Sequence, residues 1–118
     1  MIDIKGYEGL YAVTEDGKVW SHRSKKFLRP QLNENGYLKV GLLKDGKYKH
    51  YKVHRLVAQA YLDNLRNLAD VHHINSDRTD NRIANLKWVS HKENLIYRDV
   101  EFLRSLRFYI EIPENFTI

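Results

Sequence analysis

The 118 residues of the chain include no cysteine. Disulfide bonds are therefore excluded, and so are the structural zinc sites that depend on cysteine. A long hydrophobic run is also missing, because the N-terminal stretch MIDIKGYEGL is too polar for a signal peptide or a membrane span. We therefore expect a cytoplasmic location and no membrane partner. A chain of this length can form one domain or two small lobes.

Positive charge exceeds negative charge in this sequence. Lysine and arginine number 20 against 15 aspartates and glutamates, which gives a formal net charge of +5 and a pI near 9.4. Such a balance favours a polyanionic partner, since lysine and arginine neutralise phosphates and release their counterions. A soluble domain with a basic surface explains the charge equally well, so a nucleic-acid partner needs support from motifs.

The first half of the chain is punctuated by turn signals. Gly17, Asn35-Gly36 and Asp45-Gly46 separate short apolar and β-branched runs. Asn-Gly and Asp-Gly supply the positive φ that tight hairpin turns need, so the region 1–53 predicts a small antiparallel meander of about four or five strands. In the run 54–62 apolar side chains recur at helical spacing and predict a short amphipathic helix.

The stretch 71–95 carries the residues with the most chemistry. It opens with the adjacent histidines His72 and His73, and Asn85 and Asn94 follow His73 by 12 and 21 residues. A strand, a loop, a second strand and a helix would bring His73 and Asn94 to one point. Such a point can hold a metal and a general base on either side of a phosphate.

The helix that closes this stretch has a clear start. Ser90 is a good N-cap and Glu93 completes a capping box. We expect this helix to run from Ser90 to Arg107. The chain then divides into a β-rich region (1–53), a core with its closing helix (54–107) and a C-terminal tail (108–118).

The phrase HHIN…DNRIANLKWVS…EN resembles the HNH nuclease motif of phage and intron homing endonucleases. The resemblance implies an α+β fold in which a small N-terminal antiparallel β-sheet precedes a ββα-metal (HNH, His-Me finger) nuclease core. It also implies the roles of four residues: His73 is the general base, Asn85 orients it, and His72 and Asn94 hold one divalent cation. Histidine suits the role of base because an unperturbed pKa of about 6.5 leaves it mostly neutral at working pH.

A second resemblance covers the N-terminal region. The segment 4–21 is similar to the small NUMOD4-like motif that precedes the HNH core in many phage homing endonucleases. That family places this region along DNA, which implies phosphate contacts for the cations that follow, with a solvated loop as the alternative. These cations are Arg23, Lys25, Lys26 and Arg29. Arg55 can reach a phosphate through a bidentate fork or form a surface ion pair.

The motif departs from the family at the residue before the base. Family members often carry Asp or Asn where this sequence has His72, and imidazole is a poorer ligand for Mg²⁺ than a carboxylate. We therefore expect one divalent cation, Mg²⁺ or Mn²⁺, with Zn²⁺ and Ni²⁺ as alternatives. His91 is a rival ligand, and Asp70 either bonds His72 or remains a surface carboxylate. Because adjacent strand residues point to opposite faces, the chain must leave regular strand geometry if both histidines serve one site.

The sequence thus predicts a metal-dependent DNA endonuclease of the HNH homing type, acting on double-stranded DNA. One such site cuts one strand, so a monomer nicks, and a double-strand cut needs a homodimer or two events. If the chain is phage-encoded, its location is the host cell cytoplasm. Larger relatives carry a C-terminal DNA-reading domain that we do not expect here, so we expect a shorter recognition site, looser specificity or dependence on a partner. Two alternatives remain: an HNH-fold DNA-binding module with weak or no catalysis, and a structural domain that binds protein.

Overall fold

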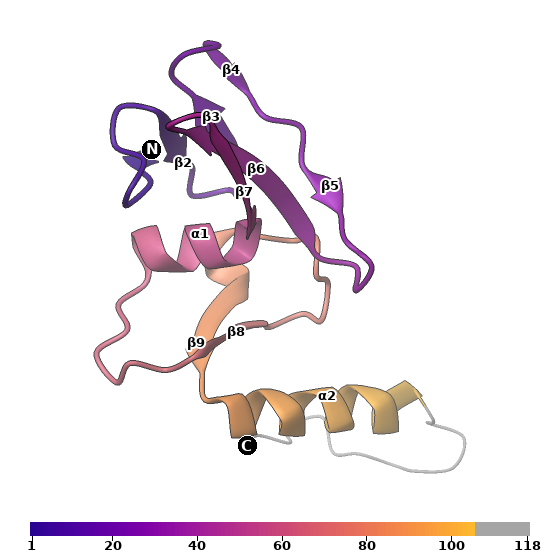
Figure 1. Cartoon of the computed structure of the whole chain (residues 1–118). Helices are drawn as coiled ribbons and strands as arrows, with labels where there is room; N and C mark the ends of the chain where they lie inside the picture. The colour runs from indigo at the N-terminus through magenta and orange to yellow at the C-terminus, as the bar shows by residue number, and fades with distance from the viewer. Residues whose placement is uncertain (106–118) are drawn as a thin grey trace.

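The computed structural model describes residues 1–105, with the side chains of residues 1–100. This part of the chain folds into short strands and two α-helices, so the predicted α+β class is confirmed (Figure 1). The elements follow in the order β1 (Ile2–Asp3), β2 (Tyr11–Val13), β3 (Val19–Ser21), β4 (Lys26–Phe27), β5 (Gln31–Leu32), β6 (Leu38–Lys44), β7 (Lys47–Lys52), α1 (Val53–Tyr61), β8 (Asp70–His73), the 3₁₀-helix η1 (Ile83–Asn85), β9 (Leu86–Val89) and α2 (His91–Ser105).

The strands of the N-terminal region form two sheets in place of the single predicted meander. β1 to β4 make a four-stranded sheet, β5 to β7 make a three-stranded sheet, and β8 pairs separately with β9. Pro30 lies between β4 and β5. Because proline lacks an amide hydrogen and has a fixed φ, it does not carry a hydrogen-bonded ladder from one strand into the next.

The hairpin β6–β7 turns one face toward the core and the other outward. Val40 and Leu42 on β6 are buried. Lys39 and Lys52 pair across the same ladder and lie on the opposite face, because side chains alternate along a strand. The outer face of this hairpin therefore presents positive charge.

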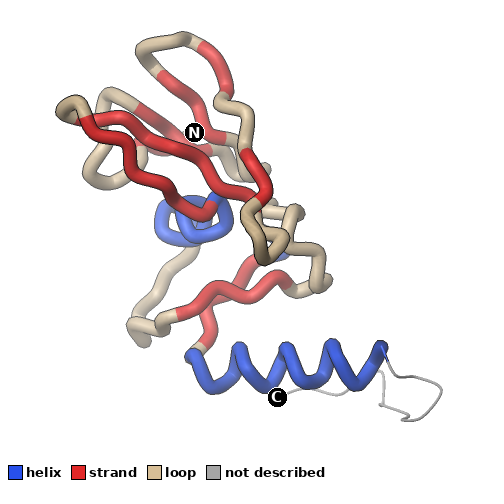
Figure 2. Tube along the Cα trace, turned by 45° about the vertical axis from the view of Figure 1, so that its right-hand side comes forward, coloured by secondary structure: helices blue, strands red, loops and turns tan. Residues whose placement is uncertain are grey.

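Helix α1 lies at the centre of the fold, between the N-terminal sheets and the β8–β9 pair (Figure 2). Its residues Val53, Leu56, Val57 and Ala58 are buried. They belong to one hydrophobic cluster with side chains from β2, β3, β6, β8 and β9. Burial of each large aliphatic side chain contributes about 1.5–3 kcal/mol. One core therefore spans the predicted boundary between residues 53 and 54.

The β8–β9 pair leads directly into α2. The Glu93 amide donates to Ser90 Oγ (3.0 Å) and the Ser90 amide donates to Glu93 Oε1 (3.4 Å), so the predicted capping box is confirmed. The predicted end of this helix at Arg107 and the tail 108–118 lie outside the described residues. Within residues 1–105 no helix is both long enough and apolar enough to cross a membrane.

Candidate active site

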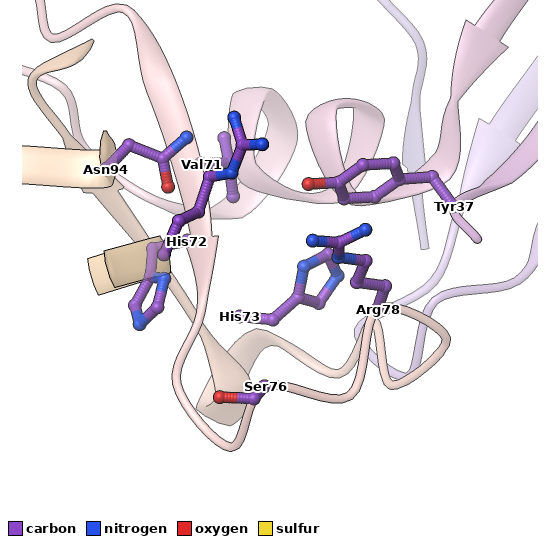
Figure 3. A pocket seen from close by; sticks show the side chains of 8 residues that line it. Tyr37, Val71, His72, His73, Ser76, Arg78 and Asn94 are labelled. Carbon is purple, nitrogen blue, oxygen red and sulfur yellow. The ribbon is translucent and has the colours of Figure 1, made fainter. Parts of the chain in front are cut away.

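A small polar cavity of about 20 Å³ lies beside the end of β8 (Figure 3). This volume holds about one water molecule or one ion, since a single water needs roughly 10–15 Å³ on this measure. Strand β8, the loop after it, α2 and a residue just before β6 contribute to the walls. The lining residues are Tyr37, Val71, His72, His73, Ser76, Arg78, Asn94 and Arg98. Three of the four predicted catalytic and metal residues therefore come together here, and Asn85 is not among them.

The two histidines reach the cavity from opposite sides of β8. The strand stays regular through both residues, with His72 paired to Lys87 and His73 to Leu86, so the expected departure from strand geometry was wrong. Figure 3 shows the His73 ring turned toward Tyr37 and the His72 ring on the other side of the strand. Because the cavity lies beside the end of β8, residues on both faces of the strand line it, and the strand does not need to bend.

The His73 ring is buried, with 5% of the residue exposed. Its Nε2 lies 2.7 Å from Oδ1 of Asn81. Burial lowers the pKa of His73, and the hydrogen bond to Asn81 and the charge of Asp77 offset only part of that effect. The ring is therefore neutral near neutral pH, which is the state in which histidine can accept a proton.

The side chain of Asn85 hydrogen-bonds the loop that follows β8. Its Oδ1 accepts the Asn75 amide (2.9 Å), and its Nδ2 donates to Asn75 Oδ1 (2.9 Å) and to the Asp80 carbonyl (2.9 Å). The Asn85 carbonyl also accepts the Ile74 amide (2.8 Å). Asn85 thus fixes the two ends of the loop, and the side chain that hydrogen-bonds the His73 ring is Asn81.

Asn81 was missed in the sequence analysis. It stands inside the quoted phrase DNRIANL, but no periodicity or spacing marks it among the polar residues of its loop. The resemblance assigns the orienting role to Asn85 and gives no role to Asn81, which lies four positions earlier. The contact depends on how the loop folds back over β8, which local sequence does not show.

Asp70 joins the two candidate ligands on α2. Its Oδ2 accepts hydrogen bonds from His91 Nδ1 (2.9 Å) and Asn94 Nδ2 (3.1 Å). Burial would raise the pKa of Asp70, but these hydrogen bonds outweigh it and the pKa lies below its usual value. Asp70 therefore bonds two residues of α2, His91 and Asn94. Because the amide nitrogen of Asn94 is engaged, its carbonyl oxygen is the atom that can bind a cation.

The donor set at this cavity fits a cation that keeps much of its own solvent shell. Within the described side chains, no three His, Cys, Asp or Glu residues gather as a metal site. His72 and Asn94 offer one imidazole nitrogen and one amide oxygen, so water and phosphate would complete the shell, as is usual for Mg²⁺. The imidazole suits Mn²⁺, Ni²⁺ or Zn²⁺ better. The His72 ring stacks on Tyr97, with centroids 4.0 Å apart, which fixes the plane of the imidazole.

An aromatic and basic wall faces His73 across the cavity. Tyr37 stacks on His54, with ring centroids 5.0 Å apart, and its centroid lies 5.9 Å from that of His73. The Arg78 guanidinium lies 5.0 Å from the Tyr37 ring and donates to the Asn35 carbonyl (2.7 Å). Tyr37 and Arg78 were not singled out in the sequence, because their contacts join segments about forty residues apart.

The cations predicted to contact DNA fall into two groups. Lys25, Lys26 and Arg29 are exposed, on β4 and the loops beside it. Lys25 takes a positive φ of 53°, which sharpens the turn between β3 and β4. These three side chains are therefore available to an external phosphate.

Two other predicted DNA contacts are engaged inside the chain. Nη2 of the Arg23 guanidinium donates to the Tyr11 hydroxyl (3.0 Å) and to the Leu43 carbonyl (2.6 Å). Arg55 donates to the Ala69 carbonyl (2.9 Å). Both arginines therefore hold the fold together, and their phosphate contacts stay a prediction.

The β8–β9 pair, the helix α2 and the histidines at the end of β8 define a ββα-metal nuclease fold. Residues 51–96 match the HNH endonuclease family, and residues 2–42 match the NUMOD4 motif. The chain is a member of the HNH homing endonucleases with an N-terminal NUMOD4 motif, as the sequence predicted.

The relatives agree with this assignment. The chain is 42% identical over 93 residues to the DNA endonuclease I-HmuI of Bacillus phage SP01, across 79% of this chain and 53% of that protein. It is 39% identical over 87 residues to an uncharacterised HNH endonuclease of Acanthamoeba polyphaga mimivirus, across 74% of this chain and 26% of that one. A solved structure of DNA binding and cleavage by the HNH homing endonuclease I-HmuI matches with a TM-score of 0.72 at 39% identity, over 93% of this chain and 60% of that chain. The chain thus spans about half or less of the length of these two curated relatives.

Proposed function

We propose that this protein is a metal-dependent DNA endonuclease of the homing type that hydrolyses a phosphodiester bond in double-stranded DNA. The observation that carries the proposal is the position of His73. Its buried ring lines the same ion-sized cavity as His72 and Asn94, so a base and a cation can act on one phosphate from two sides. The relative I-HmuI is a DNA endonuclease, which supports DNA as the substrate class.

In this proposal His73 removes a proton from the attacking water, a step that contributes ~10²–10⁴-fold in typical enzymes. His72 and Asn94 would hold one divalent cation, which supplies Lewis-acid stabilisation to the phosphate oxygens. Arg78 and Arg98 line the same cavity and add positive charge beside the phosphate. Asn85 keeps the loop after β8 closed, so that His73 and Arg78 stay in place.

Exposed cations on the N-terminal sheet would bind the DNA backbone. We assign this role first to Lys25, Lys26 and Arg29, which are exposed. Arg23 is exposed as well, but its guanidinium donates to the Tyr11 hydroxyl and the Leu43 carbonyl. Arg23 and Arg55 donate to acceptors within the chain, so a smaller contribution is expected from them. Replacing the first three residues with alanine should reduce the slope of log affinity against log salt by about 2–3, since each phosphate contact contributes about 0.9.

The number of active sites sets the number of DNA strands cut in one event. A single site of this kind cleaves one phosphodiester bond, so we propose that the monomer nicks DNA. A double-strand cut would require a homodimer or two successive events. The ratio of open-circle to linear plasmid early in the reaction distinguishes these cases.

Cleavage of supercoiled plasmid and of phage genomic DNA tests the proposal. The assay compares Mg²⁺, Mn²⁺ and EDTA for the wild type, for His73→Ala and for the control His50→Ala, which replaces an exposed histidine on β7. Cation-dependent nicking by the wild type and His50→Ala, abolished in His73→Ala, is the expected result. Cleavage that survives both EDTA and His73→Ala would refute the proposal. A protein that binds both DNAs and cuts neither would be an HNH-fold DNA-binding module.

A further inference from the structure

His73 touches a buried asparagine that the HNH roles leave unassigned. Nε2 of His73 lies 2.7 Å from Oδ1 of Asn81, and the two residues are 5% and 3% exposed. This distance is short even for N–H···O hydrogen bonds, whose usual separation is about 2.9 Å. An amide oxygen only accepts hydrogen bonds, so Nε2 carries the proton and Nδ1 keeps the lone pair. The contact therefore selects one neutral tautomer of the base.

The Asn81 amide is held weakly by hydrogen bonds. Its Nδ2 is buried and has no hydrogen-bond partner among the described residues, so Oδ1, bonded to His73, anchors this amide. A side chain with so few bonds needs steric support to keep one orientation. That support must come from atoms packed against its Cβ and backbone.

The turn between β2 and β3 supplies this support. Gly17 has φ +89°, and a Cβ built on it would lie 2.8 Å from Asn81 Cβ and 2.9 Å from the Asn81 carbonyl oxygen. Only glycine allows the backbone to approach so closely in this conformation. Two residues earlier in the turn, the Glu15 carbonyl accepts the Ile83 amide (3.0 Å). The N-terminal turn and the loop that carries Asn81 are therefore in direct contact.

We propose that Asn81 is a positioning residue that holds His73 as the Nε2–H tautomer, and that Gly17 holds Asn81 in place. Nδ1 is then the nitrogen that accepts the proton from water. This inference rests on the proposed function for its catalytic consequence. It makes the geometry of the base depend on the N-terminal NUMOD4 motif, which supplies Gly17, as well as on the HNH module.

Nitrogen NMR of the histidine rings tests the role of Asn81 without cation or DNA. The samples are the wild type, Asn81→Leu, which removes the acceptor, and Asn81→Asp, which keeps one. Long-range proton–nitrogen correlations of His73 should show the Nε2–H tautomer in the wild type and in Asn81→Asp. Asn81→Leu should lose that preference. The Nδ1–H tautomer in the wild type, or an unchanged His73 pattern in Asn81→Leu, would overturn the proposal.

Two matched glycine variants test the role of the turn. Gly17 and Gly46 have φ +89° and +75°, and a Cβ at Gly46 meets nothing within 4 Å, so Gly17→Ala and Gly46→Ala share the backbone strain and differ in the contact with Asn81. We expect Gly17→Ala to shift the His73 ring signals and to slow single-turnover cleavage by ~10–100-fold, as small misplacements of catalytic groups do. Gly46→Ala should do neither. Equal effects of the two variants would overturn the role of Gly17.

Failure of this inference can be told apart from failure of the proposed function. A wild type that shows the Nε2–H tautomer but cuts no DNA would contradict the nuclease proposal and leave the positioning of His73 intact. Cleavage that proceeds with equal rate in Asn81→Leu would contradict the positioning role and leave the nuclease proposal intact. If thermal unfolding shows that Gly17→Ala does not fold, the pair Asn81→Leu and Asn81→Asp decides the question.

Discussion

The buried ring of His54 makes the stability of this protein sensitive to mild acid. His54 is 5% exposed and its Nδ1 has no hydrogen-bond partner. Burial, with a smaller contribution from the neighbouring His73, lowers its pKa from 6.5 to about 3. In the unfolded chain the ring regains its ordinary pKa, so the unfolded state binds a proton first as the pH falls. The contribution of neutral His54 to stability is therefore complete above about pH 6.5 and is lost progressively toward about pH 3.

The size of this effect follows from linkage. One proton taken up only by the unfolded state lowers the free energy of unfolding by about 1.4 kcal/mol per pH unit. Between about pH 6.5 and about pH 4.5 the loss from His54 amounts to about 2–3 kcal/mol. Below that range, protonation of carboxylates such as Asp70 and Asp77, whose pKa values are also lowered, adds to the loss.

Urea unfolding at a series of pH values, followed by tryptophan fluorescence, measures this dependence. The test compares the slopes of wild type and His54→Leu, with His50→Leu as the exposed-histidine control. We expect the slope of His54→Leu to be smaller by about 1.4 kcal/mol per pH unit and that of His50→Leu to match the wild type. Equal slopes for the wild type and His54→Leu would refute the account of a neutral buried ring.

Three further predictions concern the core, the hydroxyl of the half-buried Tyr61 and the cation. Leu42→Ala, at a side chain with 0% exposure, should lower the free energy of unfolding by about 2–5 kcal/mol in urea titrations. Tyr61→Phe removes a 2.7 Å hydrogen bond to the Val13 carbonyl and should cost about 1–3 kcal/mol in the same assay, because that carbonyl loses its partner. Asp70→Ala frees the Asn94 amide and should weaken Mn²⁺ binding ~10-fold in calorimetry, as loss of a residue that orients a ligand does; unchanged Mn²⁺ affinity would contradict that role.

Features that depend on nearby residues were predictable from the sequence. The capping box uses Ser90 and Glu93, which are adjacent on one helical turn, and the structure contains both of its hydrogen bonds. The grouping of His72, His73 and Asn94 around one cavity follows from a strand pair and a helix that are consecutive in the chain. Short connections leave few ways to arrange such elements, so spacing carries the information.

Contacts between distant segments were not predictable. The approach of Gly17 to Asn81 and the stacking of Tyr37 on His54 arise when the N-terminal sheets pack against the nuclease core. Arg23 was assigned to DNA, yet it donates to a backbone carbonyl. Every residue carries such a carbonyl, so the sequence gives no sign of which one an arginine will find.

The central claim is that His73 and Asn94 have separate roles at one cavity. The most direct test measures cation binding, DNA binding and single-turnover cleavage separately in His73→Ala and in Asn94→Ala. If His73 is the base and Asn94 a cation ligand, His73→Ala will bind Mn²⁺ and DNA like the wild type and cleave at least ~10²-fold more slowly. Asn94→Ala will lose Mn²⁺ affinity and recover part of its cleavage rate at high Mn²⁺ concentration. Cleavage by His73→Ala at the wild-type rate, or wild-type Mn²⁺ affinity in Asn94→Ala, would contradict the division of roles across this cavity.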